Sequence, residues 1–266
     1  MSTEQCTAVT YGIDLGKTWF HVVGLDTAGS PVKRAKLNRA SITRFFVNLP
    51  RALVGMDACP GSQWLARKLQ ALGHEVRIVP AQFVKPYVKS NKNDTIDAEA
   101  IAEAIAEAIA QPTMRFVQIK HCEQVDLQAL HHSRELLVST RTRLINQMRA
   151  FCLEYGVAIR NGVGAFKVSL PTVLGDEGND LTPAMRELLV NLTQELTTLE
   201  DRIAQFTRKI NAQADVCNNA RRLATIPGVG QLTATALVAA VGDARQFKTA
   251  RNLSAWLGLE HFRFIC

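Results

Sequence analysis

Two aspartates three residues apart, Asp94 and Asp97, have the type and spacing to hold a metal ion. They open a run rich in Ala, Glu and Ile over residues 98–110, which predicts a helix with Asp94 or Thr95 as its N-cap. Positions i and i+3 of a helix share a face, so both carboxylates can point at one spot. The alternative is that the two acids only cap the helix and complement its dipole.

Three lysines, Lys85, Lys89 and Lys92, stand just before these acids. Paired acids beside several cations indicate a metal held close to a polyanion, because carboxylates hold metal ions and cations attract phosphates. The chain carries 31 Lys and Arg against 24 Asp and Glu, a net charge of +7. That excess favours a polyanionic partner, although many basic proteins bind none.

Composition narrows the class of protein further. A length of 266 residues predicts one large or two medium domains. The six cysteines are scattered without a Cys-x-x-Cys pair, which argues against a disulfide framework or a zinc site. The first residues lack the features of a signal peptide, and no apolar run reaches the roughly 20 residues of a membrane span. We therefore expect a cytoplasmic protein.

Two further acids lie in apolar, strand-like runs. Asp14 stands between Gly12 and Gly16, and Asp57 ends the run that starts at Ala52. A carboxylate in a buried strand is costly unless it is paired or binds a metal. The alternative for both residues is a local bond to turn backbone.

The acids recur within a regular order of predicted elements. The pattern indicates three strands in an antiparallel meander, then helix, strand, helix, strand and helix. Asp14 lies on the first strand, Asp57 at the end of the fourth, and Asp94 and Asp97 at the last helix. The expected ranges are 9–23 for two strands, then 32–37, 41–49, 52–57, 63–72, 75–79 and 98–110.

This layout is similar to the RNase H-like fold of Holliday-junction resolvases, in which separated acids converge on one metal site. The sequence resembles still more closely the DEDD transposases of the insertion-sequence 110 family, especially its 1111 subgroup, relatives of the Piv DNA invertases. The resemblance covers essentially the whole chain. Its matching segments are Gly12–Asp14, Gly55–Cys59, Leu72–Arg77, Gln82–Pro86 and Asn91–Ala100.

The resemblance implies that Asp14, Asp57, Asp94 and Asp97 hold Mg²⁺ at a scissile DNA phosphate. It also implies a C-terminal serine nucleophile, DNA partners at the element ends and target, and a structured guide RNA. The family's second acid is usually Glu, and Asp57 is one methylene shorter. Gly12–Gly16 also resembles the phosphate strand of actin-like ATPases, but no second Asp-Gly-rich phosphate loop accompanies it.

The family's serine lies downstream of Ala255–Leu259, whereas this chain departs from the family text at Glu260 and ends at Cys266. We therefore expect a C-terminally truncated transposase that binds nucleic acid and metal but is defective in strand exchange. The alternative is a non-catalytic nucleic-acid-binding remnant. Either would be a prokaryotic, nucleoid-associated protein.

The second half of the sequence predicts helices. Residues 122–155 and 183–222 carry apolar residues at helical spacing around a Gly- and Pro-containing loop over 156–180. Two long helices around a loop predict either an antiparallel hairpin within one chain or a coil that joins two copies, and so a homo-oligomer. Adjacent His131 and His132 point about 100° apart on a helix, which is poor geometry for one metal.

A Pro-Gly-x-Gly turn at residues 227–230 enters another predicted helix and resembles the helix-hairpin-helix element. Gly228 and Gly230 would let backbone N–H groups approach DNA phosphates, with Arg245, Lys248 and Arg251 nearby. The alternative is a tight turn between packed helices.

The fold class expected from these observations is an α/β N-terminal RNase H-like (RuvC-like) domain followed by an all-α region with long helices and a helix-hairpin-helix-like element. The expected domains are a DEDD catalytic domain at 1–118, a long-helix region at 119–222 and the start of a C-terminal transposase domain at 223–266.

Overall fold

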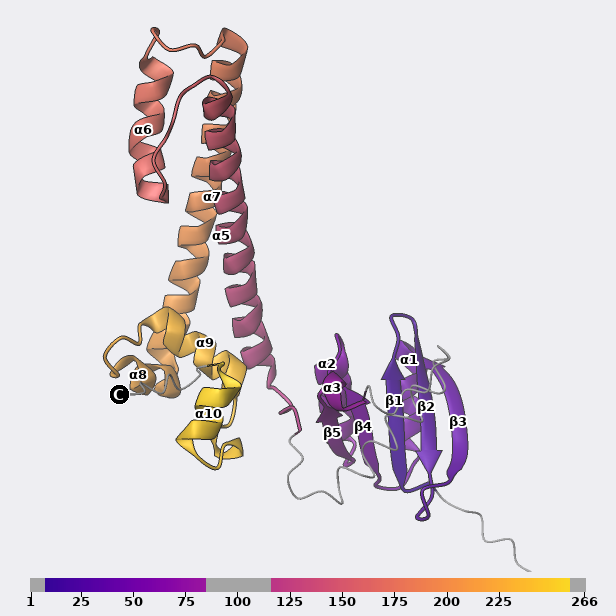
Figure 1. Cartoon of the computed structure of the whole chain (residues 1–266). Coiled ribbons are helices and arrows are strands. Elements are labelled where there is room, and N and C mark those ends of the chain that lie inside the picture. Colours follow the sequence, from indigo (N-terminus) through magenta and orange to yellow (C-terminus); the bar gives the residue numbers. More distant parts are fainter. Residues whose placement is uncertain (1–7, 85–115, 259–266) are drawn as a thin grey trace, which may run out of the picture. The chain divides into compact units, whose positions relative to one another are not determined.

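The computed structural model describes residues 8–84 and 116–258. The chain divides into two compact units, Met1–His121 and Cys122–Cys266 (Figure 1). The first is a mixed α/β unit and the second is helical, which agrees with the α/β region followed by helices that the sequence predicts. The expected boundary between residues 222 and 223 lies inside the second unit, and this finer division stays a prediction.

A five-stranded sheet forms the first unit, with strand order β3-β2-β1-β4-β5. Strands β1, β2 and β3 pair antiparallel as the predicted meander, whereas β4 pairs parallel with both β1 and β5. On β1 and β2 the residues that share one face and belong to the main core are Tyr11, Ile13, Phe20 and Val22. Strand β2 is also buried on its other face, where Val23 and Leu25 form a small separate cluster. The strands are Thr10–Leu15 (β1), Trp19–Leu25 (β2), Pro31–Asn38 (β3), Leu53–Asp57 (β4) and Glu75–Val79 (β5).

Helices α1 (Arg39–Val47) and α2 (Ser62–Ala71) cover one face of this sheet. Asn38 ends β3 and starts α1, because its side chain accepts from the Ser41 N–H while the Ser41 hydroxyl accepts from the Asn38 N–H. The short helix α3 (Ala81–Val84) follows β5. The largest buried side chains between sheet and helices are Tyr11, Phe20, Phe46, Ile13, Ile42, Met56, Leu65, Leu69 and Ile78.

The turn between β1 and β2 depends on Gly16. Its N–H donates to the Trp19 carbonyl at 3.0 Å, and a Cβ at position 16 would lie 2.4 Å from that oxygen. Only glycine permits this approach, which ties the end of β1, where Asp14 lies, to the start of β2.

Two helices of 33 and 34 residues, α5 (Cys122–Glu154) and α7 (Pro183–Val216), pack side by side in the second unit (Figure 1). Within this chain they form the antiparallel hairpin, one of the two predicted arrangements. Leu137, Leu199 and Ile203 fill the middle of the hairpin, and a larger core around Ile145, Met148 and Leu189 fills its closed end.

Two predictions for this region were wrong. Residues 156–180 are not a continuous loop, because α6 (Val163–Gly175) forms within them and includes Pro171. Phe166 and Leu170 are buried against the closed end of the hairpin, and this burial outweighs the helix-breaking signals that the sequence presents. The predicted helix over 183–222 is broken at Cys217, whose extended backbone separates α7 from α8 (Asn218–Ala224).

Helix α9 (Gln231–Val241) packs against α5, α7 and α8 at the open end of the hairpin. A 3₁₀ turn, η2 (Ala244–Gln246), leads to α10 (Ala250–Trp256). No helix among residues 8–84 and 116–258 is long and apolar enough to cross a membrane.

Candidate metal centre and nucleic-acid interface

The sheet brings Asp14 and Asp57 together. Ile13 pairs with Met56 in the parallel register of β1 and β4, so the next residue on each strand is an aspartate. Neighbouring strands lie about 4.8 Å apart, and residues in register point to the same face. Two acids distant in the sequence thus become direct neighbours on the face opposite to the buried row of Ile13 and Met56.

The turn after β4 places Cys59 beside this pair. The Cys59 N–H donates to the Asp57 carbonyl at 3.0 Å, and the Cys59 carbonyl accepts from the Ser62 N–H at the start of α2. Burial raises the pKa of the Cys59 thiol to about 12, and a hydrogen bond to Asp57 and the negative charges of Asp57 and Asp14 add to the rise. The thiol is therefore protonated at neutral pH in the metal-free chain.

Asp57 has an oxygen that the described residues leave without a donor. Its Oδ1 is buried and has no hydrogen-bond partner among the residues described in the structure. A buried carboxylate oxygen without a donor costs free energy, unless a cation takes the place of the missing partner. Carboxylate oxygens are the ligands that Mg²⁺ prefers, so the Asp14–Asp57 pair fits part of a magnesium site.

The remaining predicted residues of this centre lie outside the described part of the chain. They are Asp94, Asp97, Lys85, Lys89 and Lys92, together with the predicted helix over 98–110. Across residues 8–84 and 116–258, no three His, Cys, Asp or Glu side chains gather where they could hold a metal ion. A site with three or more carboxylates therefore stays a prediction.

Sequence reasoning missed two residues in the same cross-strand row. Asp14 pairs with His21 on β2, and His21 pairs with Lys36 on β3. The row thus runs Asp57, Asp14, His21, Lys36 across four strands of one face. His21 is 9% exposed. The alternation of Phe20 and Val22 with His21 signalled its opposite orientation, but only the strand register reveals its neighbours.

The predicted phosphate-binding turn joins two packed helices. Gly228 has a φ of +87° and lies between α8 and α9, and Gly230 caps the N-terminus of α9. A Cβ at either position would meet no atom within 4 Å, so open space lies beside both glycines. The Gln231 side chain donates to Asp215 at 2.8 Å, which ties the start of α9 to α7.

The three cations predicted near this turn differ in how they are held. Asp243 accepts from Arg245 Nε at 2.8 Å and from Nη2 at 2.6 Å, and these bonds hold the pKa of Asp243 below its usual value. This pairing offsets much of the charge that Arg245 could offer to a phosphate. Lys248 is exposed just before the N-terminus of α10, and Arg251 is exposed in its first turn.

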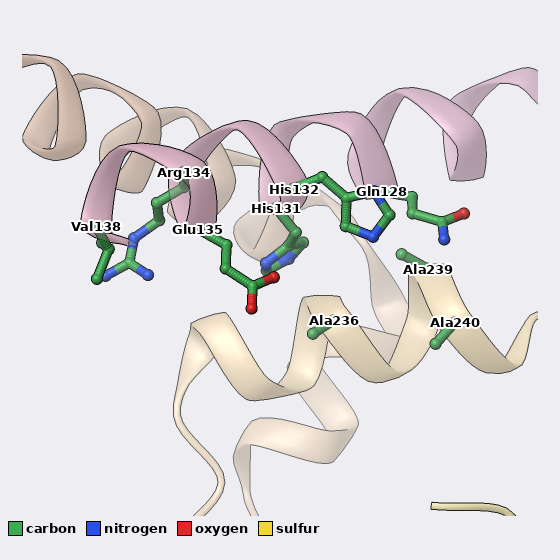
Figure 2. A pocket seen from close by; sticks show the side chains of 9 residues that line it. All are labelled: Gln128, His131, His132, Arg134, Glu135, Val138, Ala236, Ala239 and Ala240. Carbon is green, nitrogen blue, oxygen red and sulfur yellow. The ribbon is translucent and has the colours of Figure 1, made fainter. Parts of the chain in front are cut away.

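A cavity of about 470 Å³ lies between α5 and α9 (Figure 2). His131 bonds Thr235 across it at 3.0 Å, and Arg134 donates to Thr207 on α7 at 2.8 Å. Burial lowers the pKa of His131, and the charges of Arg134 and His132 lower it further. His131 therefore joins α5 to α9, and Arg134 joins α5 to α7. The lining residues are Gln128, His131, His132, Arg134, Glu135, Val138, Ala236, Ala239 and Ala240.

Two family models match this chain. Residues 11–156 match the model of the IS110 DEDD transposase family, which is described as "Transposase". Residues 220–264 match a second model, which is described as "Transposase IS116/IS110/IS902 family". A probable family 20 transposase of Pseudomonas aeruginosa is 45% identical over 249 residues, which are 93% of this chain and 72% of that protein.

Two further relatives bear on the predicted subgroup and on the invertases. The transposase for insertion sequence element IS1111A of Coxiella burnetii is 40% identical over 93% of this chain and 67% of its own length. The pilin gene-inverting protein of Moraxella bovis is 36% identical, but over only 25% of this chain and 20% of its own. The chain belongs to the IS110 family of DEDD transposases, and its link to the invertases is weaker.

Proposed function

We propose that the first unit is an RNase H-like (RuvC-like) catalytic domain that acts in Mg²⁺-dependent cleavage of DNA strands. Membership of a transposase family gives the enzyme class and the DNA partner. The observation that carries the proposal is the pair of register neighbours Asp14 and Asp57, with Asp57 Oδ1 buried and lacking a donor among the described residues. The strand order β3-β2-β1-β4-β5 supports the fold assignment.

Asp14, Asp57, Asp94 and Asp97 are the proposed metal ligands and catalytic residues. When bound, Mg²⁺ would stabilise the negative charge that develops at the scissile phosphate. The protein's own part is to hold the carboxylates in place. Parallel pairing of β1 and β4 fixes the spacing of the first two, and the protonated Cys59 thiol beside Asp57 adds no competing charge.

The second unit supplies the proposed grip on the DNA backbone through a helix-hairpin-helix-like element. Gly228 and Gly230 leave space for a phosphate beside the N-terminus of α9, with Lys248 and Arg251 as exposed cations and Arg245 already paired with Asp243. Lys85, Lys89 and Lys92 are proposed to contact nucleic acid next to the metal centre. DNA binding of this kind would associate the protein with the nucleoid.

Two further partners are proposed. The proposal that a structured guide RNA is a partner is based on the family resemblance. A homo-oligomer rests on apolar side chains that the hairpin leaves exposed, among them Leu136 on α5 at 61% and Val190 on α7 at 45%. Sedimentation of the chain should give more than one protomer, and Leu136→Glu should shift it to the monomer. A chain that sediments as a monomer before mutation would reject this contact.

The test of the proposed function is cleavage of DNA that carries the ends of the element, with guide RNA, in Mg²⁺ and in EDTA. Asp14→Asn and Asp57→Asn should each abolish Mg²⁺-dependent cleavage while the variants still bind DNA. Lys68→Ala, an exposed change on α2, is the control and should cleave normally. The alternative is a non-catalytic nucleic-acid-binding protein, and it predicts that both aspartate variants behave like the unchanged chain in every assay.

A further inference from the structure

We define the Trp19–Lys36 surface as Lys36 on the edge strand β3, Trp19 at the start of β2 and Lys17 in the turn between β1 and β2. Lys36 pairs with His21, which pairs with Asp14, so Lys36 and Asp14 lie two strands apart on one face. Trp19 is two residues from His21 on β2 and therefore points to this face too. Lys17 is exposed in the turn that joins β1 to β2.

The contacts within this surface leave an aromatic ring accessible. Trp19 is 46% exposed, although it is a large apolar side chain in a five-stranded sheet. Lys36 Nζ lies 5.6 Å from the centroid of its indole ring, within the range of a cation–π contact. A base stacked on this ring would therefore have an ammonium group beside it.

The edge strand itself is basic. Strand β3 (Pro31–Asn38) contains no Asp or Glu, and its Lys and Arg are Lys33, Arg34 and Lys36. The opposite edge strand differs, because Arg77 on β5 forms an ion pair with Glu75 on the same strand. Strand β3 thus carries three cations and no acid, whereas β5 carries a cation and an acid that pair with each other.

We propose that the Trp19–Lys36 surface binds an unpaired nucleic-acid strand and leads it to the acid pair. Exposed aromatic rings flanked by cations are how proteins bind single strands, because a base that is not paired in a duplex offers a free face for stacking. Lys17 and Lys36 contact the phosphates on either side of the stacked nucleotide. Two strand spacings, about 10 Å, separate Lys36 from Asp14. This inference rests on the proposed function for its position in the reaction, but strand binding itself needs no metal.

A competing explanation assigns the lysines of β3 a different role. Charged residues on an edge strand prevent that edge from pairing with another chain. Lys33 separates the two explanations, because it lies on the same strand, is exposed, and also contacts an aromatic ring, with its Nζ 4.8 Å from the centroid of Phe45. Its side chain points to the opposite face, towards α1. Edge protection treats Lys33 and Lys36 alike, whereas strand binding requires only Lys36.

The experiment measures fluorescence anisotropy of a labelled single-stranded oligonucleotide with the full chain in EDTA, over a range of salt concentrations. Trp19→Ala should weaken binding roughly 5- to 150-fold, the range reported by alanine substitution for one stacked base, while Trp19→Phe should stay near the unchanged chain. Lys36→Ala should reduce the slope of log K against log salt by about 0.7, the value for one single-strand phosphate contact. Lys33→Ala should change that slope much less.

Three results would overturn the proposal. In the first, Trp19→Ala binds as tightly as Trp19→Phe. In the second, Lys33→Ala and Lys36→Ala reduce the salt slope equally. In the third, a hairpin duplex binds more tightly than the single strand, and Trp19→Ala leaves its affinity unchanged. Lys68→Ala, an exposed change on α2, should bind the oligonucleotide normally in EDTA. If neither the unchanged chain nor any variant cleaves DNA, but the Trp19 and Lys36 substitutions still change strand binding as expected, the proposed function fails and the strand-binding proposal holds.

Discussion

The acid pair of the sheet and Arg186 of the helical hairpin are charged groups that differ in how far the protein satisfies their hydrogen bonds. Arg186 at the start of α7 donates to the Leu181, Leu174 and Asp176 carbonyls and to Asn179 Oδ1, at 2.6–3.2 Å. These bonds close the connection between α6 and α7. Asp57, in contrast, keeps a buried oxygen for which the described residues provide no donor.

This difference separates a structural charge from a candidate functional one. A charge whose hydrogen-bonding groups are all taken by its own chain can only hold the fold together. A carboxylate with an unused oxygen beside a second carboxylate costs stability, and that cost is offset when a ligand binds. Substitutions should therefore lower stability at Arg186 and lower ligand binding at Asp57.

The largest expected effect is at Arg186. Arg186→Ala removes several charge-assisted hydrogen bonds and leaves carbonyls without donors, so the free energy of unfolding should fall by about 3 kcal/mol. Arg186→Lys keeps the charge but loses the planar fork, and should recover less than half of the loss. Urea denaturation followed by circular dichroism measures both variants. A change below about 1 kcal/mol for the alanine variant would show that water replaces these bonds.

At Asp57 the expected effect appears only with metal. Mg²⁺ at 100 times its Kd should raise the free energy of unfolding of the unchanged chain by about 2.7 kcal/mol. Asp57→Asn should abolish this gain and, without Mg²⁺, should be about as stable as the unchanged chain or slightly more so. Asp57→Glu keeps the charge and should retain part of the gain. Thermal unfolding in Mg²⁺ and in EDTA measures this gain in stability. If Mg²⁺ stabilises the asparagine variant as much as the unchanged chain, Asp57 is not a ligand of the metal.

The two glycines before α9 should respond differently. Gly228→Ala forces an L-residue to a φ of +87° and should cost about 1–2 kcal/mol of stability. Gly230→Ala has an ordinary φ of −81° and free space for its methyl group, so the fold should be unchanged. If a phosphate occupies that space, Gly230→Ala should still weaken duplex binding. Normal binding by this variant, measured by anisotropy, would leave the element as a structural turn.

The smallest effect expected is a pH dependence at His131. Its pKa in the fold is lowered mainly by burial, so the folded chain favours the neutral imidazole that bonds Thr235. The unfolded chain then binds more protons, and stability should fall as the pH drops from about 6.5 towards the lowered value. His131→Gln should flatten this slope relative to His132→Gln, an exposed neighbour. Equal slopes in the two variants would assign the dependence to other groups.

Much of the sheet was predictable from local patterns. Alternating apolar residues and turn residues gave the antiparallel meander, and the β4, α2 and β5 predictions agree with the structure to within a few residues. Two errors lie where packing overrides local signals, as when Phe166 and Leu170 make α6 helical despite Pro171. Of the four predicted acids, the structure brings together Asp14 and Asp57, while Asp94 and Asp97 lie outside the described residues.

The sequence by itself determined most of the elements, the family and the acidic residue types, because periodicity and motif spacing are local properties of the chain. Only the tertiary structure decided which residues become neighbours. Strand register places Asp57, Asp14, His21 and Lys36 in one row, since a shift of one residue would turn any of these side chains to the opposite face. Register depends on burial of the apolar row against α1 and α2, a long-range effect that no local pattern contains.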